Sequence, residues 1–206
     1  MEGAMGKLMY LVLHCTATPE GQEVTENHIR QWHLGPVDLP GGQCRYLGKT
    51  YQSRSGLPND EIGGVNIKKL KGRGWKQVGY SKLFTLDGSV IDLVKNNHDN
   101  EVDSWEITNG ASGINNFSKH FVYAGGIAKN SHEAKDTRTE EQLSAMVNAV
   151  MDEICFVTDL LVCGHNQHAN KACPSFFVPH WLRSIGIEEK NIYTKDPFGY
   201  SKIYPA

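Results

Sequence analysis

Two largely apolar runs, one near each end of the chain, constrain the fold most strongly. Residues 8–13 (LMYLVL) form the first run and residues 156–163 (FVTDLLVC) form the second. Runs of this length are typical of strands that are covered on both faces of a sheet. His14 follows the first run directly, and His165 follows the second after a single glycine. We therefore expect a central sheet in which two buried strands each lead into a histidine.

Three further strands are predicted between these runs. Residues 78–86 alternate between apolar and polar side chains, and residues 90–94 form a returning strand. Asp87-Gly88 between them is a strong hairpin signal. Residues 119–124 form another apolar strand, which Gly125-Gly126 ends. We interpret the polar residues 95–117 as a loop.

Helix signals alternate with these strands. Thr25 is a plausible N-cap for a helix that runs to about His33. Thr139 and Gln142 fit a capping box, and apolar residues then recur at helical spacing. Pro179 near the start and Gly186 past the end frame a short last helix. The pattern predicts an α/β (α+β) fold with a mixed central sheet flanked by helices.

The amino-acid composition changes between the predicted first helix and the predicted hairpin. Residues 35–74 contain nine glycines, seven Lys/Arg and three Asp/Glu, with no clear period. We interpret them as a long basic loop with one hairpin. Loops of this length are often functional, although a tolerated surface insertion explains the pattern equally well. We expect a single domain over residues 1–206 that carries this insertion and a tail at residues 187–206.

Charge and cysteine usage exclude several classes of protein. The net charge of −2 argues against a dedicated binder of nucleic acid or of anionic membranes. Five irregularly spaced cysteines do not form a disulfide framework, which favours a reducing compartment. No apolar run is long enough to span a membrane, and the start of the chain lacks the features of an export signal. We expect a protein that is cytoplasmic when it is synthesised.

The residues that follow the two buried strands include good zinc ligands. His14, His165 and Cys173 could together supply two imidazole nitrogens and one thiolate. Three protein ligands leave a fourth position for water, as in catalytic zinc sites. His168 and Cys15 compete as ligands on residue type and position alone. Strand alternation should nevertheless point Cys15 away from whatever His14 faces.

Two other side chains could assist such a site. Lys171 lies two residues before Cys173 and could stabilise an oxyanion. Tyr80, which we place on the strand at 78–86, could donate a hydroxyl or relay a proton. A solvated surface lysine is the alternative for Lys171. For Tyr80 the alternative is a half-buried strand tyrosine, and residue type and position alone favour that structural role.

With these residues in view, the chain resembles the zinc-dependent N-acetylmuramoyl-L-alanine amidases of the bacteriophage-lysozyme and peptidoglycan-recognition-protein superfamily. The resemblance covers roughly Tyr10 to Ile185 and is interrupted at residues 35–74. It rests on five motifs that occur in the family's order: His14-Cys15-Thr16-Ala17-Thr18, Ile29-Arg30-Gln31-Trp32-His33, Gly74-Trp75 before Val78-Gly79-Tyr80, Leu86-Asp87-Gly88, and Lys171-Ala172-Cys173-Pro174-Ser175-Phe176.

The resemblance implies a role for each candidate residue. The family's zinc ligands fall on His14, His165 and Cys173, and its catalytic tyrosine and lysine fall on Tyr80 and Lys171. The implied reaction is hydrolysis of the amide between N-acetylmuramic acid and L-alanine in peptidoglycan. The implied protein is a monomeric phage or prophage endolysin that reaches the cell wall after release from the cytoplasm, without nucleic acid or membrane insertion.

Two other functions remain open at this point. A recognition module that binds peptidoglycan without cutting it is the main alternative, although such relatives typically lose the cysteine ligand. A zinc peptidase that cuts within the stem peptide is a further one. The chain contains no His-Glu-x-x-His motif, which weakens that reading.

The chain also departs from the family pattern. Gly79-Tyr80 is followed by Ser81-Lys82 rather than by histidine or asparagine, and residues 109–115 lack the histidine often found there. His120, on the following strand, is a candidate for the same space. The positive charge of the insertion could favour the carboxylates of stem peptides.

Overall fold

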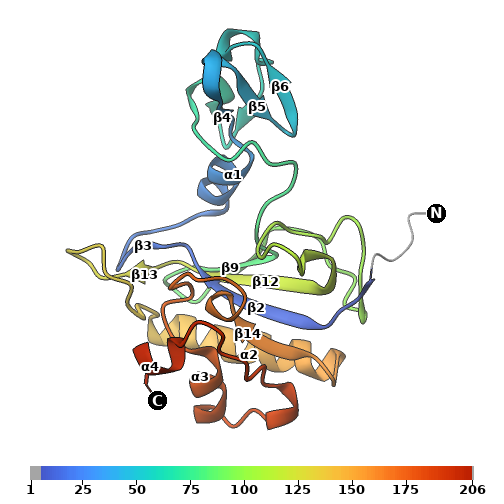
Figure 1. The fold of residues 1–206 in the computed structure, drawn as a ribbon, viewed down its shortest axis with the longest axis vertical. Coiled ribbons are helices and arrows are strands. Elements are labelled where there is room, and N and C mark those ends of the chain that lie inside the picture. Colours follow the sequence, from blue (N-terminus) through green and yellow to red (C-terminus); the bar gives the residue numbers. More distant parts are fainter. Residues whose placement is uncertain (1–5, 206) are drawn as a thin grey trace. The chain divides into compact units, whose positions relative to one another are not determined.

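The computed structural model describes residues 6–205, which divide between two compact units (Figure 1). The first, called here the sheet unit, contains the chain up to Glu23 and again from Tyr80 onward. The second, called the inserted unit, is formed by Val24–Gly79. The start of the chain, which we interpreted as lacking an export signal, lies partly outside the described residues.

The sheet unit is built on five strands in the order β10 (Val90–Asp92), β9 (Lys82–Phe84), β12 (Ser118–Tyr123), β2 (Tyr10–Cys15) and β14 (Leu161–Gly164). The β9–β10 pair is an antiparallel hairpin around Asp87-Gly88, and the other neighbours are parallel. The predicted mixed sheet and α/β fold class are confirmed.

Two helices pack against one face of this sheet. Helix α2 (Glu140–Phe156) begins with the predicted capping box, in which Thr139 and Gln142 exchange side-chain hydrogen bonds with each other's backbone N–H. Helix α3 (Val178–Ser184) has a proline in its first turn, as predicted. Shorter elements complete the unit: β1 (Gly6–Lys7), β3 (Thr18–Pro19), β11 (Glu101–Val102), β13 (Gly126–Ile127), α4 (Tyr200–Ile203) and three 3-10 turns, η4 (Asn115–Phe117), η5 (His165–Gln167) and η6 (Glu189–Asn191).

Strand alternation separates the core from the face that carries the site. Leu11 and Leu13 of β2 share the main hydrophobic cluster with Met146 of α2 and Leu182 of α3. Because successive side chains point to opposite faces, His14 lies on the face that α2 and α3 do not cover. The sheet therefore presents His14 on the side away from its helical layer.

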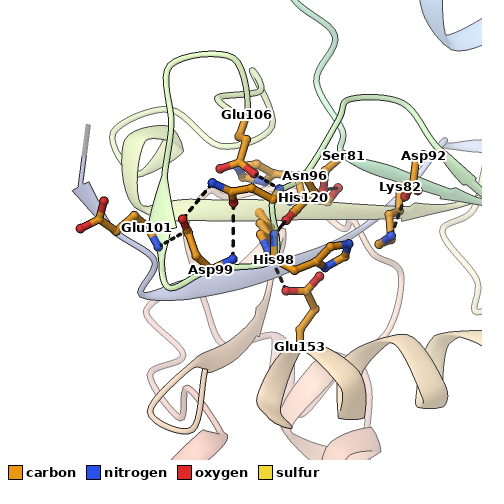
Figure 2. Close-up of polar contacts among 12 residues, drawn as sticks. Ser81, Lys82, Asp92, Asn96, His98, Asp99, Glu101, Glu106, His120 and Glu153 are labelled. Atoms are coloured by element: carbon orange, nitrogen blue, oxygen red, sulfur yellow. Dashed lines mark hydrogen bonds and ion pairs between the residues drawn. The ribbon is translucent and has the colours of Figure 1, made fainter. Parts of the chain in front are cut away.

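A buried ion pair ties the sheet to α2. The Nζ atom of Lys119 lies 2.8 Å from a carboxylate oxygen of Glu153, and both side chains are less than 5% exposed. Glu153 projects from α2 toward the sheet (Figure 2).

The inserted unit has its own small core, so the interpretation of residues 35–74 as a long loop is wrong. After α1 (Glu26–Leu34) come a three-stranded sheet and a hairpin. The strands are β4 (Val37–Asp38), β5 (Cys44–Tyr46), β6 (Lys49–Tyr51), β7 (Glu61–Ile62) and β8 (Val65–Asn66), and the 3-10 turns are η1 (Pro40–Gly42), η2 (Arg54–Gly56) and η3 (Ile67–Lys69). Strands of two or three residues are too short to show a period, which hid them in the sequence.

Three other boundaries differ from the predictions. Tyr80 precedes β9 instead of lying within a strand, and β9 itself is only three residues long. Phe156 ends α2, so β14 begins five residues later than predicted. The tail contains the short helix α4. Among the described residues, no helix is long and apolar enough to cross a membrane.

Candidate metal centre

Parallel strand pairing places His14 and His165 side by side. Leu13 of β2 is in register with Gly164, the last residue of β14, and a histidine follows each of them directly in the sequence. The two imidazole rings lie with their centroids 4.7 Å apart. Gly164 is required at this point because a Cβ atom there would come within 2.5 Å of the Asn166 side chain. The histidines that end the two apolar runs thus meet at the carboxyl ends of neighbouring strands, where α/β sheets commonly bind ligands.

A short loop brings Cys173 to the same place. Asn166 and Gln167 are buried and anchor this loop: Asn166 donates to the Phe176 carbonyl at 3.0 Å, and Gln167 accepts from the Gly164 N–H at 2.9 Å. At the other end, Ser175 donates to the Gly126 carbonyl at 2.8 Å. Cys173 is thereby held with its Sγ atom 3.6 Å from the Nδ1 atom of His14.

One ligand atom from each of His14, His165 and Cys173 lies within 4.8 Å of the other two, so the group could hold a metal ion. Two imidazoles and one thiol form a donor set that suits zinc. The two competing ligands lie outside this group. The His168 ring contacts the Cys163 sulfur at 3.2 Å, and the Cys15 sulfur lies 3.6 Å from the Ser175 hydroxyl. The assignment of the three residues as metal ligands stays a prediction.

Burial sets the protonation of the donors. Desolvation, assisted by the charges of Lys171 and His168, lowers the pKa of His165 to about 4, so its ring is neutral at pH 7. Burial raises the pKa of the Cys173 thiol well above its ordinary value. A metal ion that binds there would displace the thiol proton, which couples metal affinity to pH.

Lys171 and Tyr80 both lie close to this group. The positive charge of Lys171 helps to lower the pKa of His165 and offsets part of the rise that burial causes in the pKa of Cys173, while the lysine side chain itself is exposed. The Tyr80 ring lies 5.2 Å from the His14 ring, centroid to centroid, and is half-buried. The structure therefore brings together all five residues that the sequence singled out, although their catalytic roles stay untested.

The contacts of His120 are the part of the site that the sequence predicted least well. Its Nδ1 atom lies 3.0 Å from Nε2 of His14, and its Nε2 atom lies 2.9 Å from the Ser118 hydroxyl. Ser81 fixes its backbone, as Figure 2 shows, by donating to the His120 carbonyl at 2.8 Å. Complete burial lowers the pKa of His120 to about 3, so this ring is neutral. The sequence marked His120 as a candidate for the site, but neither its partner on β2 nor Ser118 could be read from spacing.

Comparisons with known proteins show what the chain is similar to in sequence and in fold. No family model matches the chain. In sequence, it is 26% identical over 174 residues to an endolysin of Enterobacteria phage K11, covering 84% of this chain and 83% of the relative.

Solved structures show the same fold. The N-acetylmuramoyl-L-alanine amidase LysCS, an endolysin from Clostridium intestinale URNW, aligns with a TM-score of 0.53 at 15% identity, over 89% of this chain and 87% of that one. Drosophila PGRP-LB aligns with a TM-score of 0.53 at 16% identity, over 88% and 82% of the two chains. The resemblance drawn from the motifs is confirmed.

Proposed function

The chain is a homologue of phage endolysins with the fold shared by N-acetylmuramoyl-L-alanine amidases and peptidoglycan-recognition proteins, and on this basis we propose that it is a zinc-dependent peptidoglycan amidase. It hydrolyses the amide between N-acetylmuramic acid and L-alanine during lysis of a bacterial host. In this proposal the protein acts as a monomer on the cell wall, after it leaves the cytoplasm in which it is made.

One observation carries the proposal: His14, His165 and Cys173 converge on a single point at the carboxyl ends of two parallel strands. A module that only recognises peptidoglycan has no need of three convergent zinc donors. His14, His165 and Cys173 would hold the ion, and bound zinc would supply polarisation of the scissile carbonyl and a water of lowered pKa.

The chain's own side chains perform the remaining steps. The Lys171 ammonium, beside His165 and Cys173, stabilises the negative charge that develops on the carbonyl oxygen. Tyr80, packed against the His14 ring, uses its hydroxyl to position the attacking water or to pass a proton to the leaving amine.

The inserted unit contributes affinity for the wall. Its 56 residues carry nine Lys/Arg and four Asp/Glu, a formal charge of +5 in a chain of net charge −2. A groove of about 550 Å³ in this unit has no carboxylate among its lining residues, which are Trp32, Val37, Arg45, Lys71, Gly72, Arg73 and Trp75. The Arg73 guanidinium lies 5.1 Å from the centre of the Trp75 ring. Exposed cations beside aromatic faces suit a glycan that carries stem-peptide carboxylates.

Clearing of purified cell walls tests the activity. The full chain, with its metal content measured, is added to a wall suspension with and without a chelator. The proposal expects clearing that the chelator stops and that added zinc restores. Binding to the walls without any clearing, at full zinc content, would favour the recognition module instead.

A further inference from the structure

We propose that His120 and Ser118 are positioning residues for the metal centre, because a chain of hydrogen bonds through them turns the Nδ1 lone pair of His14 toward the metal. This inference rests on the proposed metal centre and deepens it. Neither His120 nor Ser118 belongs to the donor set or touches the substrate in the mechanism described above.

The donor and acceptor in each of these hydrogen bonds follow from the contact of Ser118 with the Ile114 carbonyl. The Ser118 hydroxyl has one proton, and it lies 2.7 Å from the Ile114 carbonyl oxygen, which can only accept. Since that proton is used, the contact of 2.9 Å between Ser118 and Nε2 of His120 requires His120 to donate. The proton of the His120 ring therefore sits on Nε2.

The same argument determines the donor in the hydrogen bond between His120 and His14. With its proton on Nε2, the neutral His120 ring has an acceptor at Nδ1, which lies 3.0 Å from Nε2 of His14. His14 must then donate from Nε2, and its lone pair is left on Nδ1. That atom is the one that lies 3.6 Å from the Cys173 sulfur. The reverse direction would bring the Ser118 oxygen and the Ile114 carbonyl to 2.7 Å with no proton between them.

The fold makes this chain rigid. β12 runs parallel to β2 with His120 opposite Val12 and Val122 opposite His14, so both histidines lie on the same face of the sheet. Ser81 fixes the His120 backbone by donating to its carbonyl at 2.8 Å and accepting from its N–H at 3.1 Å. Neither His120 nor Ser118 has any exposed surface. Partners that orient a ligating histidine typically change metal affinity by about 10–100-fold when they are removed.

The first test needs no substitution. Nitrogen-15 NMR of the metal-free full chain, labelled at histidine, reports which ring nitrogen of His14 carries the proton. The proposal expects the proton on Nε2 for both His14 and His120. A proton on Nδ1 of His14 would overturn it.

Zinc affinity provides the second test, measured by competition with a coloured chelator. His120→Leu removes the acceptor at similar volume and should weaken zinc binding by about 10–100-fold. His120→Asn keeps an oxygen near the position of Nδ1 and should stay closer to wild type. Ser118→Ala should give an intermediate loss, and His132→Leu, a control at an exposed histidine outside the donor set, should give none.

Wild-type zinc affinity in a folded His120→Leu protein would overturn the proposal, as would equal losses in the His120→Leu and His132→Leu variants. If His120→Leu does not fold, the NMR result and Ser118→Ala still decide. Neither readout uses peptidoglycan, so failure of the proposed amidase reaction and failure of this inference are separately visible.

Discussion

The Nδ1 atom of His14 lies 3.6 Å from the Sγ atom of Cys173, although 159 positions separate the two residues in the sequence. The contact exists because β2 and β14 pair in parallel and because the loop after β14 folds back on its own buried side chains. A donor set built this way depends on the sheet for two of its members and on the loop for the third.

Removal of the thiol should therefore remove the metal. We expect Cys173→Ala to lose its zinc and to lose more than about a hundredfold in wall hydrolysis, since even changes outside the ligand set cost up to that factor. Metal analysis and the clearing assay on the same preparation check both effects. Cys155→Ala, at an exposed cysteine, should keep both properties. Full metal content and full turnover in Cys173→Ala would refute the ligand assignment.

Lys171 and Tyr80 should affect rate without affecting metal content. Lys171→Met is expected to lower kcat by about 10²–10³-fold, and Tyr80→Phe by about 10²-fold or more, because each supplies a group used only during reaction. Steady-state kinetics on a soluble muramyl peptide measure the effect. Lys129→Met, at another exposed lysine, serves as the control. Unchanged kcat in either site variant would remove that residue from the mechanism.

The groove of the inserted unit should govern wall binding. We expect the triple variant Arg45→Gln, Lys71→Gln, Arg73→Gln to bind peptidoglycan about tenfold more weakly, since exposed charge pairs contribute up to about 1 kcal/mol each. The matched control removes the same charge from Lys49, Lys69 and Lys76, which are exposed outside the groove. Co-sedimentation with walls stripped of phosphate polymers provides the measurement. Equal losses in the two triple variants would show that the groove has no specific role.

His33 should make the inserted unit sensitive to acid. Burial, helped by the charge of Arg73, lowers the pKa of His33 to about 4, and its Nδ1 atom accepts a hydrogen bond from the Gly79 N–H at 3.0 Å. The unfolded chain binds this proton near pH 6.5, so the free energy of unfolding should fall as the pH drops from about 6.5 to about 4, by on the order of 3 kcal/mol.

Urea titrations across this pH range measure that slope. His33→Gln should flatten it, whereas the same substitution at the exposed His132 should leave it unchanged. If the slope in His33→Gln equals that of wild type, the ring does not titrate as its burial implies.

Loss of one member of the buried Lys119–Glu153 ion pair should destabilise the protein more than replacement of both members. Lys119→Met leaves the Glu153 carboxylate buried without its partner and should destabilise the protein by about 3–5 kcal/mol. Replacement of both residues, by Met and Leu, should restore stability to within about 1 kcal/mol of wild type. Lys135→Met, which breaks an exposed pair with Glu20, should cost less than about 1 kcal/mol. Denaturant unfolding compares the three.

Local signals in the sequence were enough for much of this architecture. The run before His14, the Asp87-Gly88 turn and the Thr139 capping box each act over a few neighbouring residues, and each appears in the structure. The resemblance then selected His14, His165 and Cys173 from a larger set of candidates. Tyr80 was wrongly predicted to lie on a strand because apolar and polar side chains alternate before β9, although the residues there do not pair with another strand.

What the sequence could not provide depends on long-range pairing. The contact between His14 and His120 requires the register of β2 against β12, which no periodicity encodes. The core of the inserted unit forms between strands only two or three residues long, around Cys44, Tyr46 and Ile67. The apolar side chains of these strands are spaced too irregularly in the sequence for a core to be predicted from it.

The most direct test of the central claim is the identity of the bond that is cut. Defined peptidoglycan is digested with the zinc-loaded full chain, and the fragments are identified by mass spectrometry. We predict intact glycan strands whose N-acetylmuramic acid residues carry free lactyl carboxyl groups, together with stem peptides that carry a free L-alanine amino terminus. Fragments cut within the peptide or between sugars would contradict the assignment of this protein as an amidase.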